Sequence, residues 1–574
     1  MNFLISFIFI LFSYGCHLGK KNTQKIASFP LHSDISSLDP ALVYDSVTSQ
    51  ITYSCYETLY EYHYLKRPFT LQPLLAESMP SLSENKTKIT IKIKPQIAYH
   101  PDPAFKGQVR FVKAQDFING FKRLAFEPLK SNGWWLVDGK IKGINEFRKK
   151  VGSDLEKFYH TDIEGLSAPD DYTLIIKLNN AHSPFLFSLA MTFTAPIPLE
   201  AITFYQNNLS DHMIGTGPFI LKEKTESFVK MQKFPDYQKR AVLYPHDGDR
   251  QAHDQNLLDY AGKTLPFLDE LHFYIIKEEE DRWQSFLQNK IDIHVLVKEH
   301  LDDALTTTGT LQKKWEKKNI NLRIAPTLIL WWIGFNMQDP IIGKNKNLRK
   351  AIAHAINMDE FVQKFTHNMA QKANSIYIPG VFGYSPSTLP PYSFNRDKAK
   401  WYLKEAGYPD GKNLPPLRFE TRNESSLHFD MAKFIEQQLQ QININLEIVV
   451  NTFPTFLEKS KKGKNQIWQD GWNLDYPDAE NLLQLLTKKS HSPGPNKSFY
   501  VNSEFEKLYS NLLESDTLDK KNDLMLKMQN IIFEDVPWIL QYYDRRYILV
   551  QSKLKNFRYS DFNYNVTKYL DIDN

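Results

Sequence analysis

The sequence predicts an α/β or mixed protein that contains parallel β-sheet, and three patterns support this class. Apolar and polar residues alternate with a period of two over 88–94, 172–178 and 271–275, as they do in half-buried strands. Apolar residues recur at helical spacing over 348–356. A strand pattern, a helix pattern and a second strand pattern follow one another over 417–450.

The stretch over 417–450 gives the clearest prediction of local topology. Leu417 and Phe419 mark one strand, and Ile442 to Ile448 repeat the same alternation. Between them lies an apolar stripe with the spacing of a helix face, formed by Leu427, Met431, Phe434, Ile435 and Leu439. Strand, helix and strand within about 35 residues make a βαβ unit, whose strands are parallel and joined by a right-handed crossover. We therefore expect a parallel sheet with a helix on its face.

Two further segments have recognisable ends. Asn395 is a common N-cap residue, apolar residues at helical spacing follow it, and Gly407 is placed to end that helix. Residues 215–218 (Gly-Thr-Gly-Pro) predict a tight turn that leads into a strand at 219–221.

Length and composition exclude several classes of protein. At 574 residues the chain is long enough for about two to four domains, and 42% hydrophobic with 24% charged residues is typical of globular proteins. Lys and Arg number 70 against 66 Asp and Glu and form no dense basic block, so we expect no nucleic-acid partner. Aromatic residues reach 13%, enough to line a large cleft as well as to fill cores.

The first residues have the pattern of an export signal. Residues 3–14 form a continuous apolar run, which is too short for a membrane-spanning helix of about 20 residues but suits a secretory signal. Residues 13–16 (Ser-Tyr-Gly-Cys) look like a bacterial lipoprotein cleavage box, in which Cys16 receives the lipid. Tyr14 is bulkier than usual there and no Lys or Arg precedes Phe3, so ordinary secretion is the alternative. We expect a periplasmic or cell-envelope protein whose membrane contact is a lipid anchor at Cys16.

The sequence lacks the motifs of the common catalytic and metal sites. Leu257 stands where a phosphate-binding loop ending at 262–264 would need glycine. There is no Gly-x-Ser-x-Gly or His-Glu-x-x-His motif, and the 16 histidines are scattered without zinc-ligand spacing. Cys55 lies among aromatic and apolar residues and is predicted to be buried and unreactive. We expect no cofactor, no metal and no enzymatic activity, which leaves a binding protein in preference to a secreted hydrolase.

Several short motifs occur in order along nearly the whole chain. They are 37–40 (Ser-Leu-Asp-Pro), 55–62 (Cys-Tyr-Glu-Thr-Leu-Tyr-Glu-Tyr), 75–78 (Leu-Ala-Glu-Ser), 114–117 (Ala-Gln-Asp-Phe), 215–219 (Gly-Thr-Gly-Pro-Phe), 234–237 (Phe-Pro-Asp-Tyr), 265–270 (Leu-Pro-Phe-Leu-Asp-Glu), 347–352 (Asn-Leu-Arg-Lys-Ala-Ile), 403–408 (Leu-Lys-Glu-Ala-Gly-Tyr) and 471–478 (Gly-Trp-Asn-Leu-Asp-Tyr-Pro-Asp). Together they resemble the family 5 extracellular solute-binding proteins, the oligopeptide and dipeptide receptors of ABC importers.

This resemblance implies a type II periplasmic-binding-protein fold, in which two lobes surround a cleft and an extra domain is inserted in lobe I. It assigns 1–16 to the signal peptide, 26–66, 196–278 and 542–574 to the discontinuous lobe I, 67–195 to the inserted domain and 279–541 to lobe II. Family members capture a peptide between the lobes and pass it to an ABC permease in the inner membrane. We expect a monomer that does the same. The alternatives are a receptor for another amine-bearing solute or a metal chelate, and a peptide sensor without transport.

Asp475 is the predicted anchor for the ligand. The ammonium of a peptide calls for a partly desolvated carboxylate on the cleft wall. Asp475 occupies the position at which peptide-binding family members carry the aspartate that holds the peptide amino terminus. It follows Gly471 and Trp472 of the Gly-Trp motif, and Trp472 and Tyr476 would exclude water from it. The alternative is that Asp475 caps a helix that begins near Asp478, although Asp478 suits that cap better.

The resemblance also assigns the segment after the Leu-Asp-Pro motif to the extended peptide, which it would hold by strand-like addition. This places Tyr44, Asp45 and Ser46 along the ligand, and a surface loop is the alternative.

Two positions depart from the family pattern. Gln469 replaces an arginine that can meet a carboxylate, and Asn119 replaces an aromatic hydroxyl, so the ligand's carboxyl end has no predicted partner. Trp331, Trp332 and Phe335 either pack in the core, which we favour, or wall the cleft.

Overall fold

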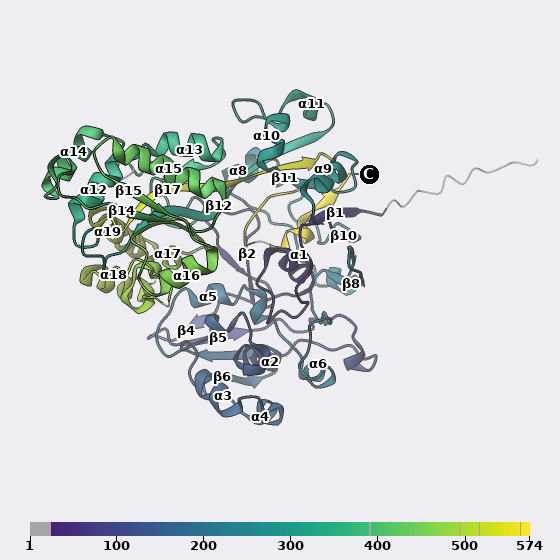
Figure 1. The fold of residues 1–574 in the computed structure, drawn as a ribbon. Helices are drawn as coiled ribbons and strands as arrows, with labels where there is room; N and C mark the ends of the chain where they lie inside the picture. The colour runs from purple at the N-terminus through teal and green to yellow at the C-terminus, as the bar shows by residue number, and fades with distance from the viewer. Residues whose placement is uncertain (1–23, 390–391, 493, 516, 563, 574) are drawn as a thin grey trace, which may run out of the picture.

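The protein has a mixed α/β fold built on three larger sheets, which confirms the predicted class (Figure 1). The computed structural model describes residues 24–389, 392–492, 494–515, 517–562 and 564–573. The predicted signal segment and the predicted lipid site at Cys16 lie outside these described residues.

The largest sheet has seven strands and lies on the upper left of Figure 1. Its strands are β11 (Ile293–Val295), β12 (Ile320–Phe335), β13 (Gln371–Lys372), β14 (Leu417–Glu420), β15 (Leu446–Val449), β16 (Ile467–Asn473) and β17 (Trp538–Gln551). They are ordered β11-β17-β12-β16-β14-β15, with β13 beside β17. The long strands β12 and β17 run antiparallel and form its spine.

The predicted βαβ unit is confirmed within this sheet. Strands β14 and β15 pair in parallel, with Leu417 opposite Leu446, and α15 (Ser426–Gln440) connects them. The predicted apolar stripe supplies the buried side of α15, where Met431, Phe434 and Leu439 lie in the core, except at Leu427, which is 45% exposed. Periodicity alone therefore identified this unit.

Helices cover both faces of the large sheet. They are α9 (Glu279–Leu287), α10 (Lys298–Ala304), α11 (Lys313–Glu316), α12 (Lys346–Ala355), α13 (Met358–Thr366), α14 (Arg396–Glu405), α16 (Phe453–Lys461), α17 (Glu480–Leu483), α18 (Ser503–Glu514) and α19 (Leu518–Asp535). The predicted helices at 348–356 and after Asn395 are confirmed. The Asn395 side chain accepts a hydrogen bond from the Lys398 backbone N–H, and Gly407 has the positive φ of +91° that a helix end requires.

The other two larger sheets have four strands each. One has the order β1-β10-β9-β8 and the other β4-β5-β7-β6. Their bounds are β1 (Ile26–Leu31), β8 (Phe219–Lys224), β9 (Phe228–Lys233), β10 (Glu270–Ile275), β4 (Ser81–Leu82), β5 (Lys88–Lys92), β6 (Leu166–Asp170) and β7 (Thr173–Lys177). The strands predicted at 88–94, 172–178, 219–221 and 271–275 are confirmed. A single hydrophobic core extends over both sheets, which therefore pack as one unit.

Helices and short two-stranded sheets complete this part of the molecule. The helices are α1 (Ser46–Cys55), α2 (Ala114–Ala125), α3 (Ile144–Val151), α4 (Leu155–His160), α5 (Phe185–Ser188), α6 (Leu199–Phe204), α7 (Pro235–Gln238) and α8 (Arg250–Asp254). The short sheets pair β2 (Tyr60–Tyr62) with β3 (Leu71–Pro73), and β18 (Leu554–Lys555) with β19 (Asp571–Ile572).

The turn at 215–218 requires glycine at both Gly215 and Gly217. A Cβ atom at Gly215 or Gly217 would lie 2.0 or 2.6 Å from the carbonyl oxygen of Cys55, which ends α1. Only glycine therefore lets this turn pack against the helix. Cys55 is fully buried, as predicted, and burial raises the pKa of its thiol above the usual range, which keeps it protonated.

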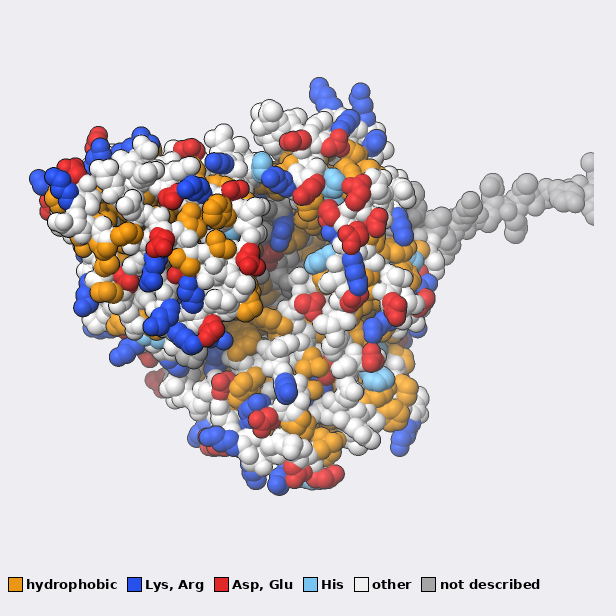
Figure 2. Space-filling view, in the orientation of Figure 1, with side chains coloured by type: hydrophobic (Ala, Val, Ile, Leu, Met, Phe, Trp, Pro, Cys, Tyr) orange, Lys and Arg blue, Asp and Glu red, His pale blue; other side chains and the backbone are white. Residues whose placement is uncertain are grey.

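The lobe boundary predicted at residue 542 falls inside β17, which stays paired in the large sheet as far as Gln551. The lobe boundaries therefore stay a prediction. Figure 2 shows a hollow between the half that carries β12 and β17 and the half that carries β1 and β10. Across the described residues, every helix is too short or too polar to span a bilayer.

Candidate ligand-binding site

The Gly-Trp motif lies at the end of β16, where the strand pairs antiparallel with β12. Gly471 is opposite Trp331, and a Cβ at Gly471 would lie 2.8 Å from the Trp331 ring. Glycine therefore allows this indole to lie flat on the strand. Trp331 is half-buried, stacks on Tyr542 and has the Arg422 guanidinium 5.3 Å from its ring. Trp332 and Phe335 are buried, so the core assignment is confirmed for these two residues.

Asn481 organises the loop that carries Asp475. Its Oδ1 accepts hydrogen bonds from the Trp472 indole Nε1 at 2.9 Å and from the Asp475 backbone N–H at 3.0 Å. Its Nδ2 donates to Asp475 Oδ2 at 3.2 Å. The Asn481 side chain is completely buried, so it holds the tryptophan and the carboxylate in one fixed arrangement. Asn481 was not predicted; its only signal in the sequence is a polar residue directly before the leucine pair at 482–483.

Asp475 meets Tyr44 from the other half of the molecule. The Tyr44 hydroxyl donates to Asp475 Oδ1 at 2.8 Å, although the two residues are 431 positions apart. Tyr44 itself is 57% exposed, so this contact lies at an open rim. Partial burial raises the pKa of Asp475, while the hydrogen bonds from Tyr44 and Asn481 and the positive charge of Lys140 act in the opposite direction.

The Asp475 carboxylate keeps an uncompensated charge. Over the part of the chain that the structure describes, both of its side-chain hydrogen-bond donors are neutral, and no cationic side chain forms an ion pair with it. A carboxylate offers about four acceptor positions, so two remain for a further donor. A half-buried carboxylate of this kind can bind the ammonium of a ligand.

Tyr476 is buried and supports the loop from behind. Its ring stacks on Phe187 of α5 at a centroid distance of 5.9 Å and an interplanar angle of 7°. Its hydroxyl donates to Glu480, whose second oxygen accepts from the Tyr509 hydroxyl. Because both Glu480 oxygens are occupied, this neighbouring carboxyl is engaged internally, and burial raises its pKa. Tyr476 is thus fixed by its contacts with Phe187 and Glu480, and its role in shielding Asp475 stays a prediction.

Two aspartates, the predicted site residue Asp45 and Asp478 near Asp475, accept hydrogen bonds from backbone N–H groups at helix starts. Asp45 caps α1, since its Oδ1 accepts from the Thr48 backbone N–H at 2.7 Å and its Oδ2 from the Ser36 hydroxyl at 2.6 Å. Asp478 Oδ1 accepts from the Glu480 backbone N–H at 2.8 Å, at the start of α17. Asp478 lies one residue before Ala479, which directly precedes α17, and it is Asp478 rather than Asp475 that accepts this hydrogen bond from the first helical residue, as the sequence favoured.

Ser46 is the exposed first residue of α1. Of the three residues predicted to lie along the ligand, it is Tyr44 that the structure brings to Asp475.

The two positions that depart from the family pattern are buried. Gln469 donates to the Gln541 side-chain carbonyl at 3.0 Å, between β16 and β17. Asn119 donates to the Ile197 carbonyl at 3.3 Å. Both side-chain amides donate to internal acceptors, so neither is available to bind the carboxyl end of a ligand.

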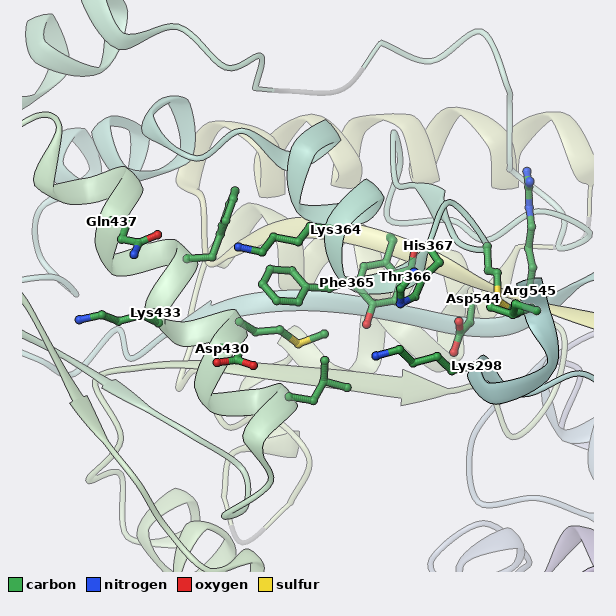
Figure 3. A pocket seen from close by; sticks show the side chains of 16 residues that line it. Lys298, Lys364, Phe365, Thr366, His367, Asp430, Lys433, Gln437, Asp544 and Arg545 are labelled. Atoms are coloured by element: carbon green, nitrogen blue, oxygen red, sulfur yellow. The ribbon is translucent and has the colours of Figure 1, made fainter. Parts of the chain in front are cut away.

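A cavity of about 870 Å³ lies at a separate place, between α10, α13 and α15 over β17 (Figure 3). Lys298 and Asp544 lie at one end, while Lys433 and Gln437 lie at the other. Its lining includes none of the predicted site residues, so the size of a cavity alone does not locate the predicted site.

The fold is that of a binding protein with two lobes. Residues 70–494 match the family "Bacterial extracellular solute-binding proteins, family 5 Middle". Because this match covers most of the chain, the protein belongs to that family, and the resemblance in the sequence is confirmed. Its fold is the type II periplasmic-binding-protein fold.

Individual relatives are distant in sequence and cover nearly the whole chain. The glutathione-binding protein GsiB of Pectobacterium atrosepticum is 25% identical over 544 residues, which are 93% of this chain and 91% of that protein. The periplasmic binding protein DppA of Helicobacter pylori, in complex with the peptide STSA, superposes with a TM-score of 0.68 at 23% identity over 96% of this chain and 98% of that one. HbpA2 of Haemophilus parasuis superposes with a TM-score of 0.77 at 21% identity over 96% and 100%.

Proposed function

We propose that the protein captures peptides between its two lobes and delivers them to an ABC permease in the inner membrane, with Asp475 as the anchor for the peptide ammonium. The observation that carries this proposal is the uncompensated Asp475 carboxylate, which meets Tyr44 from the opposite half of the molecule. We also propose that the mature chain is monomeric and is held at the membrane by a lipid on Cys16.

The charge on Asp475 gives the ligand its orientation. An ammonium about 4 Å from a carboxylate is attracted by roughly 4 kcal/mol at an effective dielectric constant near 20. Lys140 lies on the opposite half and reduces this attraction only from a distance, since it forms no ion pair with Asp475 among the described residues. The ammonium would use the acceptor positions that Tyr44 and Asn481 leave open.

The same contact couples ligand binding to closure. Tyr44 precedes α1, whereas Asp475 follows β16, and the Phe187–Tyr476 stack crosses between the same two halves. A ligand that binds at Asp475 beside Tyr44 touches both halves and stabilises the closed arrangement relative to an open one.

The chemistry of the site favours ligands with a primary amine. Glutathione and the peptide STSA, which two similar proteins are named for binding, both carry one. Another amine-bearing solute would satisfy Asp475 equally well, whereas a metal chelate without an amine would leave its charge unpaired. A peptide sensor without a permease would use the same site.

Native mass spectrometry of the protein purified from its own host tests this function. We expect copurified peptides with free amino termini in the wild-type protein and their loss in Asp475→Asn. A copurified ligand without an amine, retained in that variant, would contradict the proposal. Delivery is tested separately by pulldown of a permease with the peptide-loaded protein; failure to capture one would favour the sensor.

A further inference from the structure

Three side chains that could bind a metal ion meet beside the large sheet, away from Asp475. Glu279 is the first residue of α9, His294 is the central residue of β11 and His300 lies in α10. Their ligand atoms all lie within 4.8 Å of one another. The sequence did not predict this group, because spacings of 15 and 6 residues match no compact zinc motif.

The three facing atoms are buried and unsatisfied. Glu279 Oε1 lies 3.4 Å from His294 Nε2 and 3.9 Å from His300 Nε2. Among the residues that the structure describes, none of these three atoms has a hydrogen-bond partner. Burying a polar atom without a partner costs about 1–3 kcal/mol, so three such atoms within 4.8 Å of one another favour a common partner.

The neighbours fix the direction of each ligand atom. The Arg282 guanidinium donates to Glu279 Oε2 and to the carbonyl oxygens of Ile276 and Lys277, which leaves Oε1 turned toward the histidines. The Trp283 ring stacks on His300 at 4.6 Å and 14°. His294 is held by the pairing of β11 with β17.

We propose that Glu279, His294 and His300 form a binding site for Zn²⁺ or a similar divalent transition metal. Two ligands of a tetrahedral Zn²⁺ at about 2.0–2.1 Å from the ion lie roughly 3.3–3.4 Å apart. The 3.4 Å separation between Glu279 Oε1 and His294 Nε2 already matches this value. His300 Nε2 lies 3.9 Å from Glu279 Oε1 and within 4.8 Å of His294 Nε2, so the His300 side chain has to move toward both of the other ligands to close the site. Two imidazoles and one carboxylate are a ligand set that binds zinc with one open position.

The open position has a candidate ligand in the same chain. Glu280 Oε2 lies 3.9 Å from His300 Nε2, and this side chain is largely exposed and able to reorient. Water can fill the position otherwise. Magnesium and calcium prefer oxygen ligands, so the two imidazoles select against both ions.

An ion pair of Glu279 with a protonated histidine explains the group less well. The two imidazoles face the same Oε1, so a single proton-mediated bond would leave one of them unsatisfied. One metal ion, by contrast, satisfies all three atoms at once. Because α9 follows β10 directly, the metal would fix the first turn of α9 to β11 and α10.

Zinc titration of the metal-free full-length protein tests this proposal, with His300→Gln, His294→Gln and Glu279→Gln as site variants. The matched control is His272→Gln, because His272 also contacts a carboxylate, Glu270, at 3.0 Å but belongs to no group of three metal-ligating side chains within the described part of the chain. We expect one tight equivalent of Zn²⁺ in the wild type and in the control, and affinity at least about 100-fold weaker in each site variant, more than the loss of an outer-shell partner costs.

Two further readouts make the test decisive. Zn²⁺ is expected to raise the Tm of the wild type and of His272→Gln but not that of the site variants, whose folding without metal is checked by circular dichroism. Co²⁺ is expected to give the absorption bands of a tetrahedral site in the wild type. These bands are expected to be lost in His294→Gln and in His300→Gln. Equal Zn²⁺ affinity in the wild type and all site variants, or no tight equivalent in the wild type, would overturn the proposal.

Discussion

Asp39 and Asp475 both lie in motifs that resemble the family, but the structure uses the two carboxylates differently. Asp39 is fully buried and accepts hydrogen bonds from the Arg123 guanidinium at 2.8 and 2.6 Å and from the Ala41 backbone N–H at 2.9 Å. Asp475 is half-buried, and its side-chain hydrogen-bond donors among the described residues are the neutral groups of Tyr44 and Asn481. The charge of the partners, rather than membership of a motif, separates a structural carboxylate from one that can bind a ligand.

The largest effect is expected at the compensated carboxylate. Arg123→Met leaves the Asp39 charge buried and unpaired, which should lower the free energy of unfolding by about 3–5 kcal/mol. Chemical denaturation followed by circular dichroism measures this loss. The molecules that remain folded should bind peptide normally. Unchanged stability would show that the pair does not hold the fold.

Asp475→Asn should give the opposite pattern. Peptide affinity is expected to fall by about 2–5 kcal/mol, because the ammonium loses its charged partner. The free energy of unfolding of the ligand-free protein should not fall, since the substitution removes a partly buried charge whose pKa is raised. Calorimetry and denaturation measure the two quantities.

Asp478→Asn is the matched control for that variant. It alters the cap of α17 three residues further on and should leave peptide affinity unchanged. If Asp475→Asn instead lowered the free energy of unfolding and kept full peptide affinity, Asp475 would be a structural carboxylate like Asp39.

The pH dependence of binding should sharpen the same distinction. The raised pKa of Asp475 means that its carboxylate gains a proton at higher pH than an ordinary aspartate, while a peptide ammonium stays charged. Peptide affinity should therefore fall on acidification through that pKa, and this contribution should be absent in Asp475→Asn.

Acidification should have the opposite effect on the ligand-free protein: protonation of Asp475 should raise its free energy of unfolding. The folded state binds this proton more tightly than the unfolded state does, so protonation of Asp475 stabilises the fold. Calorimetric titrations of the wild type and Asp475→Asn across the acid range measure the change in peptide affinity. Unfolding of the two ligand-free proteins, measured in parallel, gives the change in stability. A wild-type affinity that rises on acidification would contradict the assignment.

The smallest effect is expected for Tyr44→Phe. It removes one hydrogen bond at an exposed rim, so peptide affinity should weaken by about 0.5–1.5 kcal/mol with little change in stability. Calorimetry with the same peptide measures this difference. A loss as large as that of Asp475→Asn would mean that Tyr44, and not the carboxylate, anchors the ligand.

The elements of the fold were predictable where the signal is local. The βαβ unit at 417–450, the Asn395 cap and the alternating strands follow from periodicity and capping, which depend on residues a few positions apart. The choice of Asp478 over Asp475 as the helix cap was also local.

Contacts made by the folded chain were not predictable in this way. Periodicity gives no sign that Tyr44 meets Asp475, that Asn481 holds Trp472 and Asp475 together, or that β17 extends through the predicted boundary at residue 542. The group of Glu279, His294 and His300 likewise forms only because β11 pairs with β17 between two helices.

The most direct test of the central claim is a cycle that combines Asp475→Asn with acetylation of the peptide amino terminus. Calorimetry gives the affinities of both proteins for the free and the acetylated peptide. If Asp475 binds the ammonium, either change alone should weaken binding, and the second should add little, with a coupling energy of at least about 1.5 kcal/mol. Losses that add independently would place the ammonium elsewhere and contradict the account.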